Sequence, residues 1–162
     1  PLLRKASGRI INMGSISGKV ALPLLGPYAA SKFALEALTD SMRVELMQWG
    51  MHVSIIEPGA ILTPIWEKSR KTVQTITEGL SPEAKQRYSP AINAVGKALD
   101  KHAKRGIPPE EVAKAVAHAL TAKRPRTRYV IGWKARMQIW FLKFIPDRLL
   151  DKLIVRDLNL PK

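Results

Sequence analysis

The chain has 162 residues, of which 46% are hydrophobic and 25% charged, and this composition indicates about one folded domain. It has no cysteine, which excludes disulfides, thiolate chemistry and cysteine-based zinc sites. The net charge of +14 is uneven: residues 1–67 carry six basic and five acidic side chains, and residues 68–162 carry 21 and eight. This excess predicts either an anionic partner, such as phospholipid or nucleic acid, or a solvated basic face that favours solubility.

Other features of the sequence argue against a metal site, a membrane-spanning helix and a signal peptide. The histidines at 52, 102 and 118 are scattered without ligand spacing, so we predict no metal site. No apolar run approaches the roughly 18 residues of a membrane-spanning helix, and the N-terminus lacks the apolar core of a signal peptide. We therefore expect a cytoplasmic protein, with membrane association as an open alternative. The chain begins without Met and almost directly with an apolar strand, which favours truncation.

The first predicted element is a short buried strand over residues 9–13, which leads into a turn at Gly14–Ser15. Glycines and prolines punctuate the following loop, and Pro27 suits the start of a helix. A helix is predicted from Tyr28 to Gln48, with Gly50 at its C-terminal end, because apolar residues recur at spacings of three and four. This apolar stripe consists of Phe33, Ala34, Ala37, Leu38, Met42 and Leu46.

A second strand is predicted over residues 52–56, and it ends at Glu57-Pro58-Gly59. Strand, helix and strand form a βαβ unit, whose strands are expected to be parallel with a right-handed crossover. Ligands of open parallel sheets bind outside the carboxyl ends of the strands. The turns at 13–15 and 58–63 both follow strand ends, so we expect a binding cleft at that edge.

The rest of the chain is predicted to be a lid, a helix, a strand and a tail. Residues 64–107 are polar, basic and weakly periodic, with one or two helices between 82 and 99, and we interpret them as a substrate lid. A helix is predicted from Pro108, with Val112, Ala115, Val116, Ala119 and Leu120 as its apolar stripe, followed by a strand over 127–131. We therefore predict an α/β domain over residues 1–132 and a basic, aromatic helical extension over residues 133–162.

Three side chains around the first loop suggest proton-transfer chemistry. Tyr28 and Lys32 are four residues apart and share a helix face, and Ser15 adds a hydroxyl. A free tyrosine is a weak acid at neutral pH, but a neighbouring cation favours the phenolate form. The three groups predict proton exchange with a hydroxyl or carbonyl, whereas removal of a hydride requires a cofactor. The alternative is a Tyr–Lys contact on an exposed helix face without function.

Three motifs resemble those of the short-chain dehydrogenase/reductase family. INMGSISG resembles the strand and turn that carry the family's serine, YAASK resembles its Tyr-x-x-x-Lys motif, and EPGAILT resembles its Pro-Gly motif. The resemblance is specific over residues 9–63 and holds in outline beyond them. It implies the C-terminal half of a Rossmann-like doubly wound parallel sheet, with three strands, flanking helices and a helical C-terminal extension. It also implies NAD or NADP as cofactor and the interconversion of an alcohol with a ketone or aldehyde.

The resemblance also implies roles for individual residues. Tyr28 is the expected acid/base, Lys32 its partner and a ligand of the nicotinamide ribose, and Ser15 the residue that orients the substrate oxygen. The expected cofactor-binding residues are Tyr28, Lys32, Pro58, Gly59, Ile61 and Thr63. The sequence contains no Gly-rich strand-turn-helix for the pyrophosphate and no selector for the adenosine ribose, so the choice of NAD or NADP stays open. We accordingly expect the proton-transfer half of an oxidoreductase, inactive alone.

The tail over residues 133–162 resembles the C-terminal region of retinol- and hydroxysteroid-type members, which implies a lipophilic alcohol or ketone as substrate. Its helix either lines an apolar pocket, contacts an anionic membrane surface or only covers the sheet. Nucleic-acid binding is not expected, because no reader motif is present. The helix over 28–48 forms subunit contacts in many family members, which implies a homo-oligomer. A non-catalytic membrane-surface protein and an inactive fragment stay open as alternatives.

Overall fold

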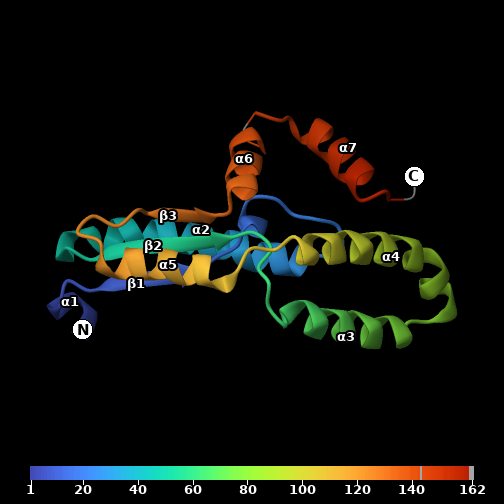
Figure 1. The fold of residues 1–162 in the computed structure, drawn as a ribbon, viewed down its shortest axis with the longest axis horizontal. Coiled ribbons are helices and arrows are strands. Elements are labelled where there is room, and N and C mark those ends of the chain that lie inside the picture. The colour runs from blue at the N-terminus through green and yellow to red at the C-terminus, as the bar shows by residue number, and fades with distance from the viewer. Residues whose placement is uncertain (143, 161–162) are drawn as a thin grey trace. The chain divides into compact units, whose positions relative to one another are not determined.

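The computed structural model describes residues 1–142 and 144–160, and the chain divides into two compact units. The first unit combines residues 1–59 with residues 107–141 and contains the sheet (Figure 1). The second unit combines residues 60–106 with the segment from Leu142 onward and is helical in the described residues. The functional division predicted from the sequence, a lid over 64–107 and an extension over 133–162, stays a prediction.

The sheet has three parallel strands in the order β1 (Arg9–Met13), β2 (His52–Pro58) and β3 (Arg128–Ile131). Met13 is paired with Ile56, and Pro58 is paired with Ile131, so all three strands end at one edge of the sheet. This arrangement confirms the predicted α/β class and the parallel βαβ unit.

Two helices of the first unit cover the sheet: α2 (Gly26–Glu45) and α5 (Pro109–Thr121) (Figure 1). Side chains of a strand alternate between its two faces, so neighbouring residues contact different helices. The face toward α5 carries the hydrophobic core, in which Ala119 packs among Ile56, Tyr129 and Ile131. Val112, Ala115 and Val116 complete the predicted stripe of α5, whereas Leu120 is half exposed and lies outside this core.

The helix α2 begins two residues before the predicted Tyr28, because Pro27 is accommodated in its first turn. It is followed by the short 3₁₀ helix η2 (Met47–Trp49), which Gly50 ends in the left-handed conformation at φ +64°. The predicted apolar stripe of α2 is largely exposed, as Phe33 and Leu38 illustrate, and the buried residues of the helix are Ala29, Glu36 and Thr39. The burial of Glu36 is explained by the ion pairs described below.

The second unit contains α3 (Ile65–Glu78), α4 (Pro82–Lys104) and α7 (Asp147–Asp157). The Ser81 hydroxyl accepts a hydrogen bond from the Ala84 N–H and caps α4, in agreement with a helix start at Pro82. The sequence did not predict α3. The short helix α1 (Leu2–Lys5) opens the chain, and α6 (Trp133–Leu142) follows β3. Among the described residues, no helix combines the length and the hydropathy needed to cross a membrane.

Candidate functional site at the carboxyl edge of the sheet

The Ser15 turn leaves the carboxyl end of β1 and is fixed to the neighbouring strand. The N–H of Gly14 donates to the carbonyl of Ile56 at 2.8 Å, which continues the sheet by one residue. Ser15 then caps the 3₁₀ helix η1 (Ile16–Gly18), with its Oγ accepting from the Ser17 N–H at 3.1 Å. The side chain is buried, with 8% of the residue exposed. Hydrogen bonds therefore fix the turn to the edge of the sheet.

Tyr28 and Lys32 share a face of α2, as their spacing predicted. The Lys32 Nζ lies 5.7 Å from the centroid of the Tyr28 ring, and it donates to the carbonyl of Met13 at 3.0 Å. Met13 ends β1 and stands two residues before Ser15, so one ammonium group connects the tyrosine to the strand end that carries the serine. Tyr28 is 47% exposed, which leaves its phenol accessible to a ligand.

The other predicted site residues fall in two places. Pro58 ends β2 at the same sheet edge, and Gly59 follows it in the first unit. Ile61 and Thr63 belong to the second unit, where the carbonyl of Ile61 accepts a hydrogen bond from the Trp66 indole at 2.6 Å. Their assignment to the border of a nicotinamide stays a prediction.

A group of charged side chains joins α2 to the sheet, and we call it the buried ion cluster after its two buried carboxyl groups: Glu36 and Glu57, with the partly exposed Lys19, Asp40, Arg43 and Arg128 around them. The Lys19 ammonium lies 2.7 Å from Glu36 Oε2 and 3.2 Å from Glu57 Oε1. Arg128 Nη2 lies 3.1 Å from the same Glu36 oxygen and 2.7 Å from Asp40 Oδ2. The cluster thus joins η1, α2, β2 and β3.

The carboxyl groups of the cluster differ in acidity because their surroundings differ. Burial, together with the neighbouring Glu36, raises the pKa of Glu57 to about 7. Burial also raises the pKa of Glu36, but hydrogen bonds with Glu57, Lys19 and Arg128 outweigh it and hold that pKa below its usual value. Hydrogen bonds from Arg128 and Arg43 lower the pKa of Asp40 to about 2. Near neutral pH the cluster therefore holds one carboxyl group that is close to its own pKa.

The buried ion cluster was not predicted from the sequence. A signal for it exists, because Glu57 directly follows the apolar pair Ile55-Ile56 in the strand, and a buried carboxylate requires a cation nearby. Its cations come from a loop and from another strand, so no local pattern identifies them. A separate polar contact joins β1 to α2, in which the side-chain amide of Asn12 donates a hydrogen bond to the Thr39 hydroxyl at 2.8 Å.

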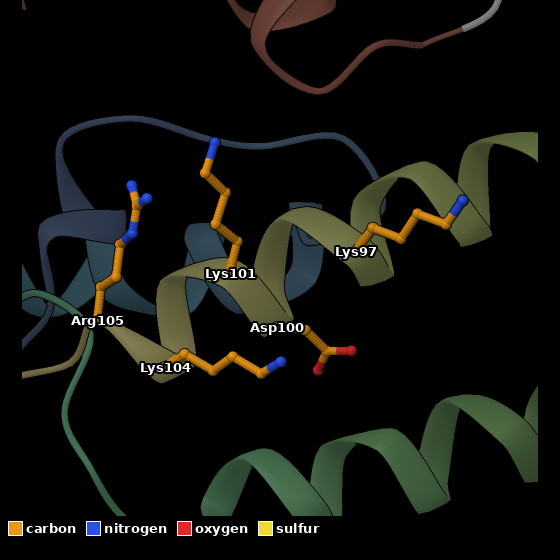
Figure 2. Close-up of a pocket in the computed structure, with 5 residues that line it drawn as sticks. All are labelled: Lys97, Asp100, Lys101, Lys104 and Arg105. Carbon is orange, nitrogen blue, oxygen red and sulfur yellow. The ribbon is translucent and has the colours of Figure 1, made fainter.

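A surface hollow of about 380 Å³ is lined by residues of α4 and its C-terminal cap, none of them predicted for the site: Lys97, Asp100, Lys101, Lys104 and Arg105. Figure 2 shows that Lys101 and Arg105 extend to one side of the helix and Lys104 and Asp100 to another. Asp100 Oδ1 lies 3.6 Å from Arg70 Nη1 of α3. Because the charged groups diverge, this hollow has the character of a solvated helix face.

Comparisons with known proteins agree with this architecture. The model of the short chain dehydrogenase family matches residues 1–74. The chain is 40% identical to an NADPH-dependent 3-dehydrocapnine reductase of Ornithobacterium rhinotracheale over 155 residues, which cover 96% of this chain and 52% of the reductase. It is 36% identical to human retinol dehydrogenase 5 over 167 residues, which cover 99% of this chain and 52% of the relative.

Among solved structures, a short chain dehydrogenase from Burkholderia cenocepacia in complex with NADP superposes with a TM-score of 0.61 at 26% identity. The match covers 99% of this chain and 51% of that one. The chain thus spans about half the length of the relatives it matches. With its motifs placed at the carboxyl edge of a parallel α/β sheet, the chain is similar to the short-chain dehydrogenase/reductase family, to the family model over residues 1–74 and to relatives over about half of their length.

Proposed function

We propose that the chain carries the proton-transfer site of an NAD(P)-dependent oxidoreductase that interconverts an alcohol and a carbonyl compound. The observation that supports this most is the position of Lys32, whose ammonium lies by the Tyr28 ring and donates to Met13 at the end of β1. This contact brings a phenol, a cation and the strand end before Ser15 to the edge where parallel sheets bind ligands.

The residues at this edge suit the nicotinamide end of a dinucleotide. An ammonium has three donors, and Lys32 uses one of them on Met13. Its remaining donors are suited to ribose hydroxyls, and Pro58 and Gly59 provide backbone at the end of the adjacent strand. The bound nicotinamide supplies the hydride chemistry that no side chain provides. The sequence contains no Gly-rich strand-turn-helix, the element that would hold the pyrophosphate.

The side chains then divide the proton chemistry between them. In the reducing direction, the Tyr28 hydroxyl gives its proton to the substrate oxygen as the carbonyl becomes an alcohol; in the oxidising direction, the phenolate takes that proton back. The Lys32 ammonium places a positive charge 5.7 Å from the centroid of the Tyr28 ring. The Ser15 hydroxyl donates a hydrogen bond to the same substrate oxygen and orients it toward Tyr28.

The substrate class we assign is a lipophilic alcohol or ketone. The names of two relatives include retinol and 3-dehydrocapnine, and retinol is a lipophilic alcohol. The exposed aromatic side chains of α6, among them Trp133 and Phe141, suit an apolar substrate. The test compares all-trans-retinol with ethanol as reductant of NADP, and retinal with acetaldehyde as oxidant of NADPH. Equal efficiency toward the small and the large compounds would contradict this substrate class.

The substitution Tyr28→Phe tests the assignment in the intact protein. Loss of the phenol hydroxyl is expected to lower kcat by about 10²–10⁴-fold, because this is the usual contribution of a general acid or base. The ring remains in place for its contact with Lys32, so NADPH binding measured by calorimetry is expected to weaken by no more than the loss of one hydrogen bond, about 10-fold. Near-normal turnover by Tyr28→Phe would rule out the proposed reaction mechanism.

A second candidate function is attachment to an anionic membrane surface through α6. This helix exposes Trp133 and Phe141, and it also carries Lys134 and Arg136, a combination typical of interfacial helices. Sedimentation with phosphatidylcholine vesicles, with and without phosphatidylserine, measures the attachment. The double substitution Trp133→Ser and Phe141→Ser is expected to abolish it, whereas Ile76→Ser, at a similarly exposed position of α3, is expected to leave it intact. Unchanged binding by the double variant would exclude α6 as the anchor.

A further inference from the structure

The Ser15 turn lies against α2 at very short range. A Cβ atom on Gly18 would stand 3.0 Å from the carbonyl oxygen of Lys32 and 3.0 Å from Glu36 Cγ. A side chain at this position would therefore require η1 or the helix turn that begins at Lys32 to shift by a few tenths of an ångström. The turn and the helix carry the two halves of the proposed site, so their separation determines whether the site can function.

Lys19 follows Gly18 and forms ion pairs from the end of the turn. Its backbone N–H closes η1 on the carbonyl of Ile16 at 2.9 Å, and its ammonium reaches one carboxylate on α2 and one on β2. Three segments of the first unit are thus joined at a single nitrogen atom. The Lys19 side chain is 26% exposed, and that of its strand partner Glu57 is fully buried.

Both carboxylates are adjacent to residues of the proposed site. Glu36 stands one helical turn after Lys32 on α2, and Glu57 directly precedes Pro58 at the end of β2. Neither oxygen of Glu57 accepts a well-directed hydrogen bond from the described residues, so the nearby cations of Lys19 and Arg128 are its compensation.

A buried ion pair is a poor means of stabilising a fold, because well-packed apolar residues of the same volume stabilise as well or better. Charges differ from apolar side chains in fixing distances and directions between the segments that carry them. An ion cluster placed where three segments of a site meet is therefore suited to setting geometry.

We propose that the buried ion cluster positions the Ser15 turn against α2, with Lys19 and Glu57 as positioning residues for proton transfer. The inference rests on the proposed function, because it assigns the cluster to the Ser15–Tyr28–Lys32 site. Neither residue contacts the substrate. Lys19 acts through the turn that carries Ser15, and Glu57 acts through Lys19.

Lys19→Met and Lys19→Arg in the intact protein test the proposal. Without its cation the turn is expected to move, which lowers kcat by about 10–100-fold, since a misplacement near 1 Å has effects of that size. The KM for NADPH is expected to stay within about 2-fold, because Lys19 does not contact the cofactor. Amide hydrogen exchange at residues 15–19, measured without cofactor, is expected to accelerate. Lys19→Arg keeps the cation and is expected to restore both slow exchange and kcat.

Two further variants make the result decisive. Lys114→Met removes a lysine that pairs with Glu111 at 2.7 Å, the same distance as Lys19 to Glu36, but on the exposed face of α5, and it is expected to change neither quantity. If Lys19→Met does not fold, the double variant Lys19→Met and Glu57→Gln removes the buried carboxylate as well and is expected to fold with a loosened turn. It then serves for the same measurements.

The outcomes separate this inference from the proposed function. If exchange and kcat of the folded Lys19 variant match the unsubstituted protein while Tyr28→Phe is inactive, the positioning role is overturned and the proposed function stands. Faster exchange with unchanged kcat overturns the positioning role as well. If Tyr28→Phe remains active, the proposed function fails, and the exchange data then show only whether the cluster holds the turn.

Discussion

The carboxyl group of Glu57 is fully buried at the end of β2, and its nearest cation is Lys19 at 3.2 Å. Ionisation of a fully buried carboxyl group that accepts no well-directed hydrogen bond is costly. Its neighbour Glu36 carries the negative charge of the pair more readily, because Lys19 and Arg128 donate hydrogen bonds to it. Two glutamates in one cluster thus have opposite pKa changes, and Glu57 is the one whose protonation changes near neutral pH.

This difference predicts the pH dependence of stability. The pKa of Glu57 rises from an ordinary 4.5 to about 7 on folding, so the folded chain binds more protons than the unfolded chain between these values. The stabilisation is complete below about pH 4.5 and is lost as the pH rises through 7, with a magnitude on the order of 3 kcal/mol. Glu57→Gln is expected to reduce the difference in Tm between pH 5 and pH 8.

The control for this measurement is Glu83→Gln, which neutralises an exposed glutamate in the first turn of α4. It is expected to leave the pH dependence of Tm unchanged. A Glu57→Gln variant with the same pH dependence as the unsubstituted protein would show that Glu57 has an ordinary pKa in the folded chain.

At the scale of elements, the close contact of η1 with α2 predicts that one methyl group added at Gly18 lowers the free energy of unfolding. Gly18→Ala places its Cβ 3.0 Å from the carbonyl oxygen of Lys32, and a helical backbone cannot yield as a flexible side chain does. Overpacking of this kind destabilises by about 1–3 kcal/mol, so thermal or urea unfolding is expected at a lower midpoint.

Gly96 provides the matched control, since it lies within α4 and a Cβ added there would meet no atom within 4 Å outside its own helical backbone and chain neighbours. Gly96→Ala is expected to stabilise α4 by about 0.5–1 kcal/mol, because alanine is the better helix former. The two substitutions add the same atom with opposite expected signs. A Gly18→Ala variant as stable as the unsubstituted protein would mean that the turn does not lie this close to the helix in solution.

The elements that the sequence predicted are those with a simple periodicity. The strands at 9–13 and 52–56 are short apolar runs, and the structure extends only the second, to Pro58. In α3 the apolar residues are few, with Ile65 and Trp66 at its start and only Val73 and Ile76 after six polar residues, so the helix was not predicted. The buried ion cluster was beyond reach of any local pattern, since Glu36 finds its partners 17 residues before it and 92 residues after it.

In the candidate site, too, one part was predicted from the sequence and another was not. The relation of Tyr28 to Lys32 follows from helical geometry, and the structure places the Lys32 ammonium by the Tyr28 ring. The bond from Lys32 to Met13 was not predicted, because it depends on how closely α2 packs against the end of β1. Sequence spacing determines which side chains share a helix face, whereas packing determines what that face contacts.

At the scale of the whole molecule, the chain leaves the sheet-containing unit after Gly59 and returns to it at Ile107. The two ends of this excursion are close together within the second unit: a Cβ atom on Gly106 would lie 3.0 Å from the carbonyl carbon of Ile61 and 3.0 Å from the N atom of Leu62. Between these ends, α3 and α4 bury only Val95 among their described residues. The two ends of the helical pair therefore lie side by side within the second unit.

This geometry makes the predicted lid removable. Replacement of residues 65–104 in the intact protein by a short Gly/Ser linker keeps Ile61, Thr63 and the contact of Gly106 with Ile61, and it leaves the core around Ile56 and Ala119 untouched. If the pair is a substrate lid, NADPH affinity is expected to persist, while kcat/KM for retinal falls by more than kcat/KM for acetaldehyde, because the larger apolar substrate has more contact to lose. Steady-state kinetics with both aldehydes measure the difference. Equal losses of kcat/KM for both aldehydes would assign the helical pair a structural role. Unchanged kcat/KM for both would show that the pair takes no part in catalysis, and the substrate pocket would then be formed by the sheet edge and the remaining segments.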